Sequence, residues 1–589
     1  MQRQSRNFTK ADADFIRRLM TDPTITIKPA DKNLGMVLVD TVWYNAELSR
    51  MLADTVTYKR FRSFMREKQD GRGKTRTLVE FATIQTELLA KLRKLAETHK
   101  KTIETWDPKL ADAVVKYLTQ TATEASTSIP TIYLLIKVHK ASGLCGRPIV
   151  PATHWLTTPA SVLADHLLQE IVRKANITHI VKDTKSFVVE LEMLRLPTAG
   201  GVFVTADIAS LYTNIDTELG LRLVHRFLID QKVPRLLAEF IMALLTFVMS
   251  NSYLQFNGTI FHQIDGTAMG TACAPIYANI VVYMLEKQVI ADMASVLHLY
   301  RRFLDDVFAY LERSAVAEFM TRMNALHPKL RFDFVTHDSE ASFLDLRIHK
   351  GRRFTDSLIF DLSVHQKKMN LYLYIPYLSF HTDAAKRSFI QTELMRYIRN
   401  SSDRNEYAEL KKIFYQRLRD RGYPSSFLLP LFGSIFYADR RFFLWPASTL
   451  HLHPDIITRP PLSACLQRRM QRWTALQRPS DSAATMQSPP VFVIPYSPLS
   501  AVLPTRELLM KAWDLIQDAM GQAIPGPIIA YQSSSSLLKT LVHARARQLA
   551  IGSEPTPTAP TAATKQTQLS SFFARGDQRP LSAPSPQSL

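Results

Sequence analysis

Cysteine, long apolar runs and acidic residues are all scarce in this sequence of 589 residues. Its three cysteines, Cys145, Cys273 and Cys465, lie far apart and form no CxxC pair. That spacing argues against a zinc site and against a disulfide framework, and it favours a reducing compartment. Apolar runs such as residues 240–249 are too short to span a bilayer, so no membrane partner is expected.

Positive charge dominates, because 73 Lys and Arg residues stand against 53 Asp and Glu residues. The resulting net charge of +20 calls for an anionic partner, and nucleic acid is the commonest one. Charge scattered over a soluble basic protein is the simpler alternative. A hydrophobic fraction of 46% is enough for the several cores that a chain of this length needs.

The spacing of apolar residues predicts strands interleaved with helices, and therefore an α+β or α/β body. After residue 444 the composition turns to Pro, Ser and Gln, and residues 551–589 hold too few bulky apolar side chains to fold alone. The expected strands are 35–39, a hairpin within 129–150, 202–206, 253–261, 303–310 and 343–348, and the expected helices are 78–100, 219–228, 234–249, 272–287, 315–326, 382–421 and 506–520.

Three acids follow strand-like runs. Asp305 and Asp306 lie between two such runs, as at the tip of a tight hairpin, although an ordinary exposed turn explains them equally well. Asp207 ends another run, where it could meet Asp305 in one sheet or could cap the following helix. Neighbouring carboxylates could hold two divalent ions, one activating a primer 3′-hydroxyl and one clamping a triphosphate. Mg²⁺ suits such a site, and Mn²⁺ could replace it.

A turn rich in small residues lies between these acids. Gly266 and Gly270 stand four residues apart ahead of a helical stretch, in a chain with only 18 glycines. Small residues would let the backbone approach a base pair closely. A tight turn that opens a helix is the simpler interpretation.

An acid after a strand, a glycine turn and then Asp-Asp on a hairpin resemble, in this order, motifs A, B and C of reverse transcriptases. The sequences of these motifs are most similar to those of Penelope-like retroelement reverse transcriptases, and the resemblance covers residues 25–430. The motifs that carry the resemblance are Asp207-Ile-Ala-Ser-Leu-Tyr-Thr-Asn-Ile215, Gly266-Thr-Ala-Met-Gly270, Phe303-Leu-Asp-Asp306, Lys28-Pro-Ala-Asp-Lys32, Tyr133-Leu-Leu-Ile-Lys-Val-His-Lys140, Arg147-Pro-Ile-Val150, Phe343-Leu-Asp-Leu-Arg-Ile348 and His365-Gln-Lys.

This resemblance implies an α+β right-hand polymerase fold with a helical N-terminal extension and a disordered C-terminal tail. The implied domains are an N-terminal extension (1–125), fingers (126–200), a palm with motifs A, B, C and the primer grip (201–350), a thumb (351–435), a linker (436–490), a small helical connector (491–548) and a tail (549–589). In such a polymerase Asp207, Asp305 and Asp306 would be the catalytic residues and the metal ligands.

The resemblance also implies roles for residues around the acids. Tyr212 would exclude a 2′-hydroxyl from the incoming sugar, unless it is a core tyrosine. Lys137, Lys140 and Arg147 would offset triphosphate charge, unless they form a solvated basic hairpin. Gln263, Gly266, Met269 and Gly270 would shape the nucleotide and template pocket.

Further roles concern the primer side of the site. The primer grip would be Phe343, Leu344, Asp345 and Leu346, which without the family resemblance reads as a core strand. Arg396 and Arg399 in the helical region 382–421 would face the heteroduplex backbone. No motif identifies the general acid that protonates the leaving pyrophosphate, and Lys350 is the candidate for this role.

The implied activity is RNA-directed DNA synthesis, with an RNA template, a DNA primer and deoxynucleoside triphosphates as partners. Many family members carry a GIY-YIG endonuclease after the polymerase; here about forty residues follow the connector, so the endonuclease-lacking type is expected and pre-existing 3′ ends would serve as primers. One alternative is a polymerase of the same fold that copies DNA, or a maturase. Another is a non-catalytic nucleic-acid-binding scaffold.

The tail contains a Q-x-x-L-x-x-F-F pattern formed by Gln566, Leu569, Phe572 and Phe573. It resembles the peptides that bind the sliding clamp, PCNA, because its apolar side chains fall on one side of a single helical turn. A chance match is the alternative. The clamp and the DNA substrate together imply a nuclear location.

Overall fold

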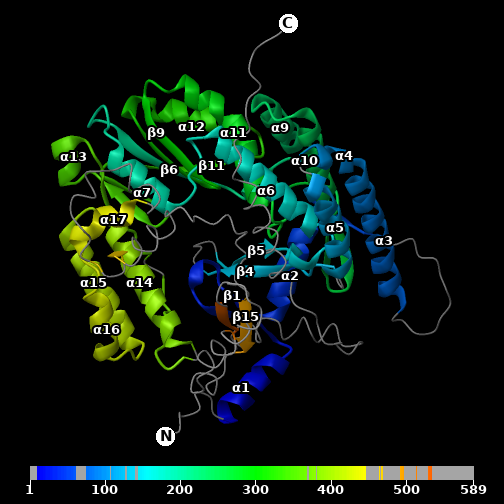
Figure 1. Cartoon of the computed structure of the whole chain (residues 1–589), viewed down its shortest axis with the longest axis horizontal. Helices are drawn as coiled ribbons and strands as arrows, with labels where there is room; N and C mark the ends of the chain where they lie inside the picture. The colour runs from blue at the N-terminus through cyan, green and yellow to red at the C-terminus, as the bar shows by residue number, and fades with distance from the viewer. Residues whose placement is uncertain are drawn as a thin grey trace.

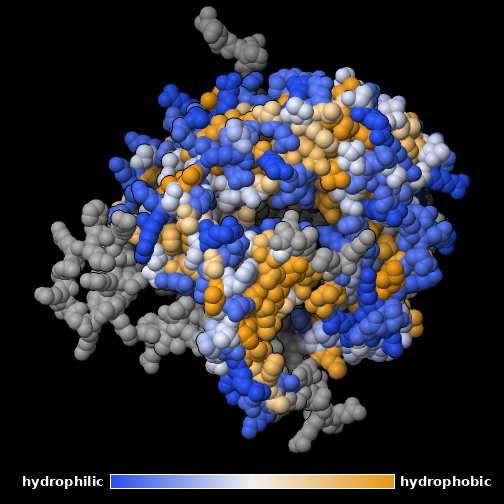
Figure 2. All heavy atoms as spheres, turned by 180° about the vertical axis from the view of Figure 1, so that it is seen from behind, coloured by the Kyte–Doolittle hydropathy of each residue, from blue (hydrophilic) through white to orange (hydrophobic). Residues whose placement is uncertain are grey.

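The computed structural model describes residues 10–61, 75–106, 108–125, 129–138, 143–367, 370–379 and 381–445, together with residues 463, 466–467, 491–495, 513 and 528–532. The expected clamp peptide, the helix expected at 506–520 apart from residue 513, and the site residue Lys140 lie outside these residues. No helix in the described part is long and apolar enough to cross a bilayer. Seen from behind, its surface is mostly hydrophilic, with apolar areas near the centre (Figure 2).

A four-stranded antiparallel sheet, called here the central sheet, has the order β11-β6-β10-β9. Alternate side chains of its inner strands enter two separate cores. Val204, Val307 and Ala309 face one core, whereas Phe203 and Phe308 face the other. Because both faces are covered, the strands read as nearly continuous apolar runs. The strands are β6 (Val202–Ile208), β9 (Leu297–Phe303), β10 (Asp306–Leu311) and β11 (Phe332–His337).

Helices cover the first face of the central sheet and extend into a layer of further helices (Figure 1). In this layer α11 is apolar on nearly all sides, as expected for a helix surrounded by protein, and Pro275 stands in its first turn. The helices are α3 (Thr75–Thr98), α4 (Lys100–Trp106), α5 (Pro108–Ala125), α6 (Thr158–Ala175), α9 (Thr217–Asp230), α10 (Arg235–Met249), α11 (Ala274–Asp292) and α12 (Val316–Asn324), and the short α8 (Leu211–Asn214) follows β6.

Two hairpins and one small sheet lie on the N-terminal side. A parallel bridge between Ala30 and Ile136 joins the two hairpins, and α2 packs on both. In the small sheet, ordered β3-β8-β7, an Asn257-Gly258 turn with positive φ at both residues connects β7 to β8, as in a type I′ hairpin. The elements are α1 (Lys10–Thr21), β1 (Ile25–Pro29), β2 (Met36–Asp40), α2 (Thr41–Leu52), β3 (Tyr58–Arg60), β4 (Tyr133–Lys137), β5 (Cys145–Ile149), β7 (Ser252–Phe256) and β8 (Thr259–Gln263).

The second face of the central sheet is covered by α7 and by a sheet ordered β12-β13-β14, beyond which lies a C-terminal helical bundle (Figure 1). The bundle has a core of its own, built around Ile390, Leu394 and Phe414. The elements are α7 (Thr184–Met193), β12 (Glu340–Phe343), β13 (Leu346–His349), α13 (Arg352–Ser357), β14 (Asp361–Val364), α14 (Asp383–Asn400), α15 (Arg404–Asp420), α16 (Ser425–Phe432) and α17 (Arg440–Leu444).

Several expectations from the sequence need correction. The runs expected as single strands at 253–261 and 303–310 are each divided by a turn, the strand expected at 343–348 is a hairpin, and the helical stretch 382–421 is two helices that separate at Ser401. The N-terminal extension expected to be helical contains, besides the expected strand β2, strands β1 and β3. The connector expected to be helical contains two parallel strands, β15 (Val491–Pro495) and β16 (Ile528–Gln532). Helices α6 and α7 and strand β11 were not expected.

Candidate active site

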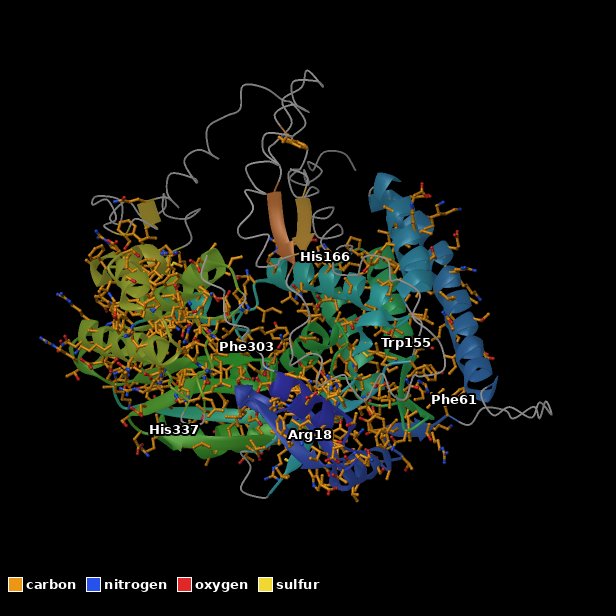
Figure 3. All side chains as sticks on the ribbon, turned by 90° about the horizontal axis from the view of Figure 1, so that it is seen from below. Arg18, Phe61, Trp155, His166, Phe303 and His337 are labelled. Atoms are coloured by element: carbon orange, nitrogen blue, oxygen red, sulfur yellow. The ribbon has the colours of Figure 1, made fainter. Side chains whose placement is uncertain are left out.

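The register of the central sheet brings the three predicted acids together. Asp207 on β6 stands directly opposite Asp306 on β10, and the backbone carbonyl of Asp305 accepts a hydrogen bond of 2.9 Å from the amide of Ile208. Phe303 pairs with Asp306, so Leu304 and Asp305 form a two-residue turn. The acids therefore share one end of the sheet. The labelled Phe303 lies between the C-terminal bundle and the α3 side of the molecule (Figure 3).

Leu304 has a φ of +55°, a conformation that costs free energy for a side chain other than glycine. Arg302 holds this turn from inside the protein. Its guanidinium is fully buried, and Nη1 donates a hydrogen bond of 3.0 Å to the carbonyl of Leu304. The strained turn and its acids are thus attached to a buried group.

Arg302 is itself fixed by side chains from α11. Its Nε donates to both carboxylate oxygens of Glu286, at 3.1 and 3.0 Å, and its Nη1 also donates to Oδ1 of Asn279 at 2.9 Å. Tyr300 donates its hydroxyl to Glu286 at 2.7 Å. A buried ion pair needs such additional hydrogen bonds to offset desolvation. The helix after the glycine turn and the Asp305 turn are therefore connected through one buried network.

Burial and the neighbouring acids both raise the pKa of Asp306. Burial by surrounding protein raises the pKa of Asp306 to about 6, and the charges of Asp305 and Asp207 add to this rise. Lys367 and Lys32 oppose it. These two exposed lysines belong to the motifs around His365 and Lys28, to which the sequence comparison assigned no role at the acids. Only the tertiary structure shows that both act on Asp306.

The glycine turn joins two other segments through its backbone. The amide of Thr267 donates a hydrogen bond of 2.6 Å to the carbonyl of Tyr212, and the amide of Val150 donates a hydrogen bond of 2.8 Å to the carbonyl of Met269. A Cβ at Gly266 would lie 2.7 Å from the carbonyl oxygen of Thr213, and both glycines have positive φ. The close approach is therefore to the protein's own backbone, and the predicted approach to a base pair stays a prediction.

Tyr212 and Arg147 lie near the acids. Burial and the charge of Asp305 raise the pKa of Tyr212 to about 12, against the opposing effect of Arg147. Both charges therefore act on the hydroxyl of this ring. Arg147 also lies 3.5 Å from Oδ2 of the buried Asp31. Lys137 stands on the adjoining strand, two residues beyond the partner of Arg147. The two cations share the face of the hairpin that points away from its core.

Gln263 is placed differently from the expectation that it lines a nucleotide pocket. The residue is 2% exposed, and its side-chain amide donates a hydrogen bond of 3.1 Å to the carbonyl of Asp265 in the next turn. The observed contact supports the glycine turn from behind, and a contact with nucleotide stays a prediction.

The predicted primer grip is a hairpin with a second Phe-Leu-Asp turn. Phe343 and Leu346 lie in the core beside the central sheet, and Leu344 has a φ of +57°. Asp345 accepts hydrogen bonds at Oδ2 from Arg396 at 2.6 Å and from Asn400 at 3.2 Å. The hairpin thus fastens the C-terminal bundle to the rest of the protein.

One expected role stays a prediction and another needs correction. Arg396 donates to Asp345 and also to both carboxylate oxygens of Glu393, at 3.0 and 2.6 Å, so its guanidinium serves internal ion pairs, and a contact with a nucleic-acid backbone stays a prediction. The Nζ of Lys350 donates a hydrogen bond of 2.6 Å to the carbonyl of Gly201, which precedes β6. Asp207 lies six residues further along, about 20 Å away at the rise of a strand. Lys350 cannot protonate a leaving group at the acids.

The donor set at the acids fits divalent ions. Among the described residues no group of three or more His, Cys, Asp or Glu side chains is placed to hold a metal ion by itself. A two-ion site does not require one, because Mg²⁺ takes several ligands from phosphate and water. The carboxylates of Asp207, Asp305 and Asp306 are hard oxygen donors, and a cation would relieve the repulsion that raises the pKa of Asp306.

A family model described as an animal helix-turn-helix domain matches residues 373–430, the segment that contains α14, α15 and α16. No curated protein matches the chain. Telomerase from Candida albicans, solved with a TWJ fragment of telomeric RNA, is similar with a TM-score of 0.44 and 8% identity, over 78% of this chain and 74% of that one.

Two further solved structures are similar at lower scores. Apo telomerase from Candida tropicalis, truncated from its C-terminal domain, has a TM-score of 0.30 and 11% identity, and the match covers 42% of this chain and 58% of that one. The RNA-dependent RNA polymerase of a human picobirnavirus has a TM-score of 0.37 and 11% identity, over 54% and 63%. At these scores the likeness alone assigns neither fold nor activity, so the functional argument rests on the site.

Replacing Asp306 should stabilise the protein at neutral pH in the absence of divalent ions. A carboxyl whose pKa is raised from 3.8 to about 6 by folding loses stability as the pH rises through this interval, and the loss persists above it. Asp306→Asn should therefore match the wild type near pH 4 and exceed it at pH 7.5, by on the order of 1 kcal/mol after solvent screening. Thermal unfolding midpoints at both pH values test this. The exposed Asp356→Asn serves as the control, and a gain that is equal at both pH values would contradict the prediction.

Replacing the buried Arg302 should distinguish its contribution to the stability of the fold from its contribution to the geometry of the turn at Leu304. Arg302→Leu leaves Glu286 buried without its partner and should cost on the order of 3–5 kcal/mol. Adding Glu286→Leu should restore most of the unfolding midpoint. Amide hydrogen exchange across residues 300–310 should remain faster in the double variant, because the carbonyl of Leu304 has lost its donor. Arg313→Leu, at an exposed ion pair, is the control, and wild-type exchange in the double variant would refute the role of Arg302.

Proposed function

We propose that this protein is an RNA-directed DNA polymerase of the Penelope-like retroelement type, which extends a pre-existing 3′-hydroxyl on an RNA template. The register that places Asp207 opposite Asp306, with Asp305 at the adjoining turn, carries this proposal. In such an enzyme the central sheet is the palm, the hairpin β4-β5 belongs to the fingers, and the C-terminal bundle is the thumb. The motif order in the sequence supports the same assignment.

Asp207, Asp305 and Asp306 would hold two Mg²⁺ ions, which supply charge stabilisation at the attacking and leaving oxygens. The protein's part is to keep these carboxylates in place against their repulsion, which the buried Arg302 assists. Arg147 and Lys137 would bind the triphosphate and offset its charge. Since Asp31 holds Arg147 at 3.5 Å, the cation is oriented before a nucleotide binds.

Tyr212 would select deoxyribonucleotides by occupying the space that a 2′-hydroxyl needs. Its proximity to both Asp305 and Arg147 supports this role, because those groups would hold the triphosphate of the nucleotide whose sugar lies beside the ring. The backbone bond from Thr267 to the carbonyl of Tyr212 ties this ring's position to the glycine turn. Template and nucleotide contacts would therefore be held by one connected backbone.

A second candidate function is a catalytically inactive scaffold that binds nucleic acid. The net charge of +20 and the match of the C-terminal bundle to a helix-turn-helix domain favour nucleic-acid binding without requiring chemistry. The intact acids with their dedicated buried network favour the enzyme. A scaffold has no need to hold a strained turn that carries two repelling carboxylates.

Primer extension on an RNA template with Mg²⁺ tests the enzyme against the scaffold. The wild type should add deoxynucleotides, and Asp305→Asn should lower the rate by at least about a hundredfold, because the charge that offsets the ions is lost. Asp333→Asn is a matched control, since Asp333 also stands opposite Asp207 but lies 3.0 Å from Arg331. Equal rates in the wild type and Asp305→Asn would refute the site, and inactivity of the wild type would favour the scaffold.

The tail would recruit the replication machinery. Gln566, Leu569, Phe572 and Phe573 form the proposed ligand of the sliding clamp, which would bring the polymerase to 3′ ends at nuclear replication forks or telomeres. No endonuclease is part of this proposal, so such ends would serve as primers.

A peptide of residues 560–580 should bind the clamp in a calorimetric titration. Replacing Phe572 and Phe573 together by Ala should weaken binding by at least about tenfold, because the two rings supply most of the buried apolar area. The Thr567→Ala peptide is the control, since that position of the pattern accepts any residue. Wild-type affinity in the doubly substituted peptide would dismiss the clamp ligand.

A further inference from the structure

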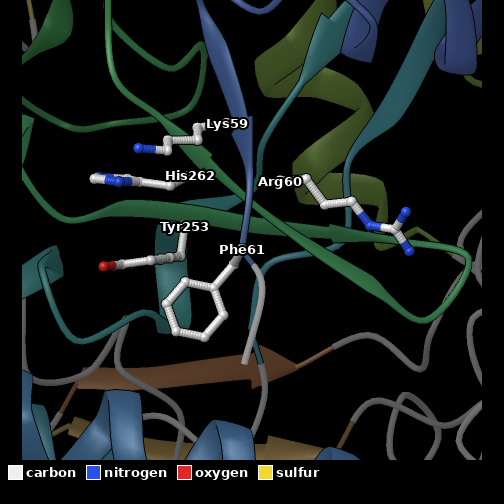
Figure 4. A pocket seen from close by; sticks show the side chains of 5 residues that line it. All are labelled: Lys59, Arg60, Phe61, Tyr253 and His262. Atoms are coloured by element: carbon white, nitrogen blue, oxygen red, sulfur yellow. The ribbon is translucent and has the colours of Figure 1, made fainter. Parts of the chain in front are cut away.

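A hollow of about 580 Å³ lies on the small sheet β3-β8-β7 and is lined by Lys59, Arg60, Phe61, Tyr253 and His262. Register places Lys59 beside His262 and His262 beside Tyr253, so one row of side chains crosses all three strands. Figure 4 shows this row with Phe61 following Tyr253, whereas Arg60 points to the other side of β3.

The aromatic part of the row is held firmly. The rings of Tyr253 and His262 stack with centroids 4.5 Å apart and planes 13° apart. Phe61 meets Tyr253 edge-on at 5.9 Å, and the buried Trp155 meets it from behind at 6.4 Å. Three neighbours thus fix Tyr253 while it remains partly exposed. A ring held in this way loses little conformational entropy when a planar ligand stacks on it.

The imidazole of His262 is also oriented. Its Nε2 lies 3.0 Å from the carbonyl of Ser250, which can only accept, so Nε2 carries a proton. Burial lowers the pKa of His262, and Lys91 and Lys59 lower it further. The row therefore presents a neutral heteroaromatic ring with cations around it.

Among the described residues, cations outnumber acids beside the row. Lys59 is exposed, and Lys91 acts on His262. Glu87 acts on Tyr253 as the opposing charge. Aromatic faces beside exposed cations are the arrangement by which proteins bind single-stranded nucleic acid, with bases on the rings and phosphates on the cations.

The hollow lies close to the glycine turn. His262 and Gln263 end strand β8, and the glycine turn that contacts Tyr212 begins at Gly266. Four residues span at most about 14 Å, so His262 lies within this distance of the turn.

We propose that Tyr253, His262 and Lys59 bind the unpaired part of the template strand ahead of the reaction centre. This inference rests on the proposed polymerase function and assigns the place where that enzyme holds its incoming template. The bases stack on the Tyr253–His262 pair, and Lys59 contacts the phosphates.

Fluorescence anisotropy of the full chain tests the proposal, with primer–template duplexes that are either blunt or carry an eight-nucleotide 5′ template overhang. The overhang should strengthen binding by the wild type. Tyr253→Leu and His262→Ala should each reduce this gain, by about tenfold for the lost stacking. Lys59→Ala should lower the salt dependence of binding by about one ion. Affinity for the blunt duplex should not change.

Arg222→Ala is the control for charge, because this exposed arginine on α9 pairs with Glu218 away from the small sheet. Unfolding midpoints identify a variant that folds poorly, and His262→Ala then replaces Tyr253→Leu as the decisive variant. An undiminished overhang gain in the variants, or an equal loss on blunt duplex, would overturn the proposal. The wild type could fail to extend primers while the overhang still strengthens its binding and the variants lose this gain. That outcome would refute the polymerase function and leave the strand-binding site standing.

Discussion

The antiparallel pairing of β6 with β10 is the constraint on which the rest of the structure depends, because it sets Asp207 opposite Asp306. Burial raises the pKa of Asp306, and repulsion by the adjacent carboxylates raises it further. The fold offsets this repulsion with packing on both faces of the sheet and with Arg302, whose buried guanidinium holds the carbonyl of Leu304. The acids are thus held at one end of a sheet whose two faces are packed with apolar side chains and whose turn is bonded to the buried Arg302.

Backbone contacts extend this order to the surrounding segments. The glycine turn bonds to Tyr212 on one side and to Val150 on the other, so the segment after β6 and the segment after β5 share one support. A Cβ at Gly270 would lie 2.1 Å from the carbonyl oxygen of Val150, which explains why glycine is needed there. A displacement of one segment must therefore be felt by the others, because backbone atoms at this separation cannot shift independently.

The tripeptide Phe-Leu-Asp occurs at two hairpin turns with different surroundings. Leu304 and Leu344 adopt nearly the same positive φ, of +55° and +57°. Asp305 then joins two other acids, whereas Asp345 pairs with Arg396 of the C-terminal bundle. Identical local sequence produces the same turn, but the chemistry of each aspartate depends on which element packs against it.

The sequence by itself determined the strong elements and the identity of the acids. Helix α10 could be predicted because its apolar residues repeat at helical spacing, and strand β6 and helix α11 because they are continuous apolar runs of strand and helix length. Strand β11 and the division at Leu304 could not, since an edge strand and a two-residue turn are defined by their partners. The tertiary structure alone decided that Lys32 and Lys367 act on Asp306, that Arg302 supports the turn, and that Arg396 serves an internal ion pair. Charges far apart in the chain interact only through distances that folding creates.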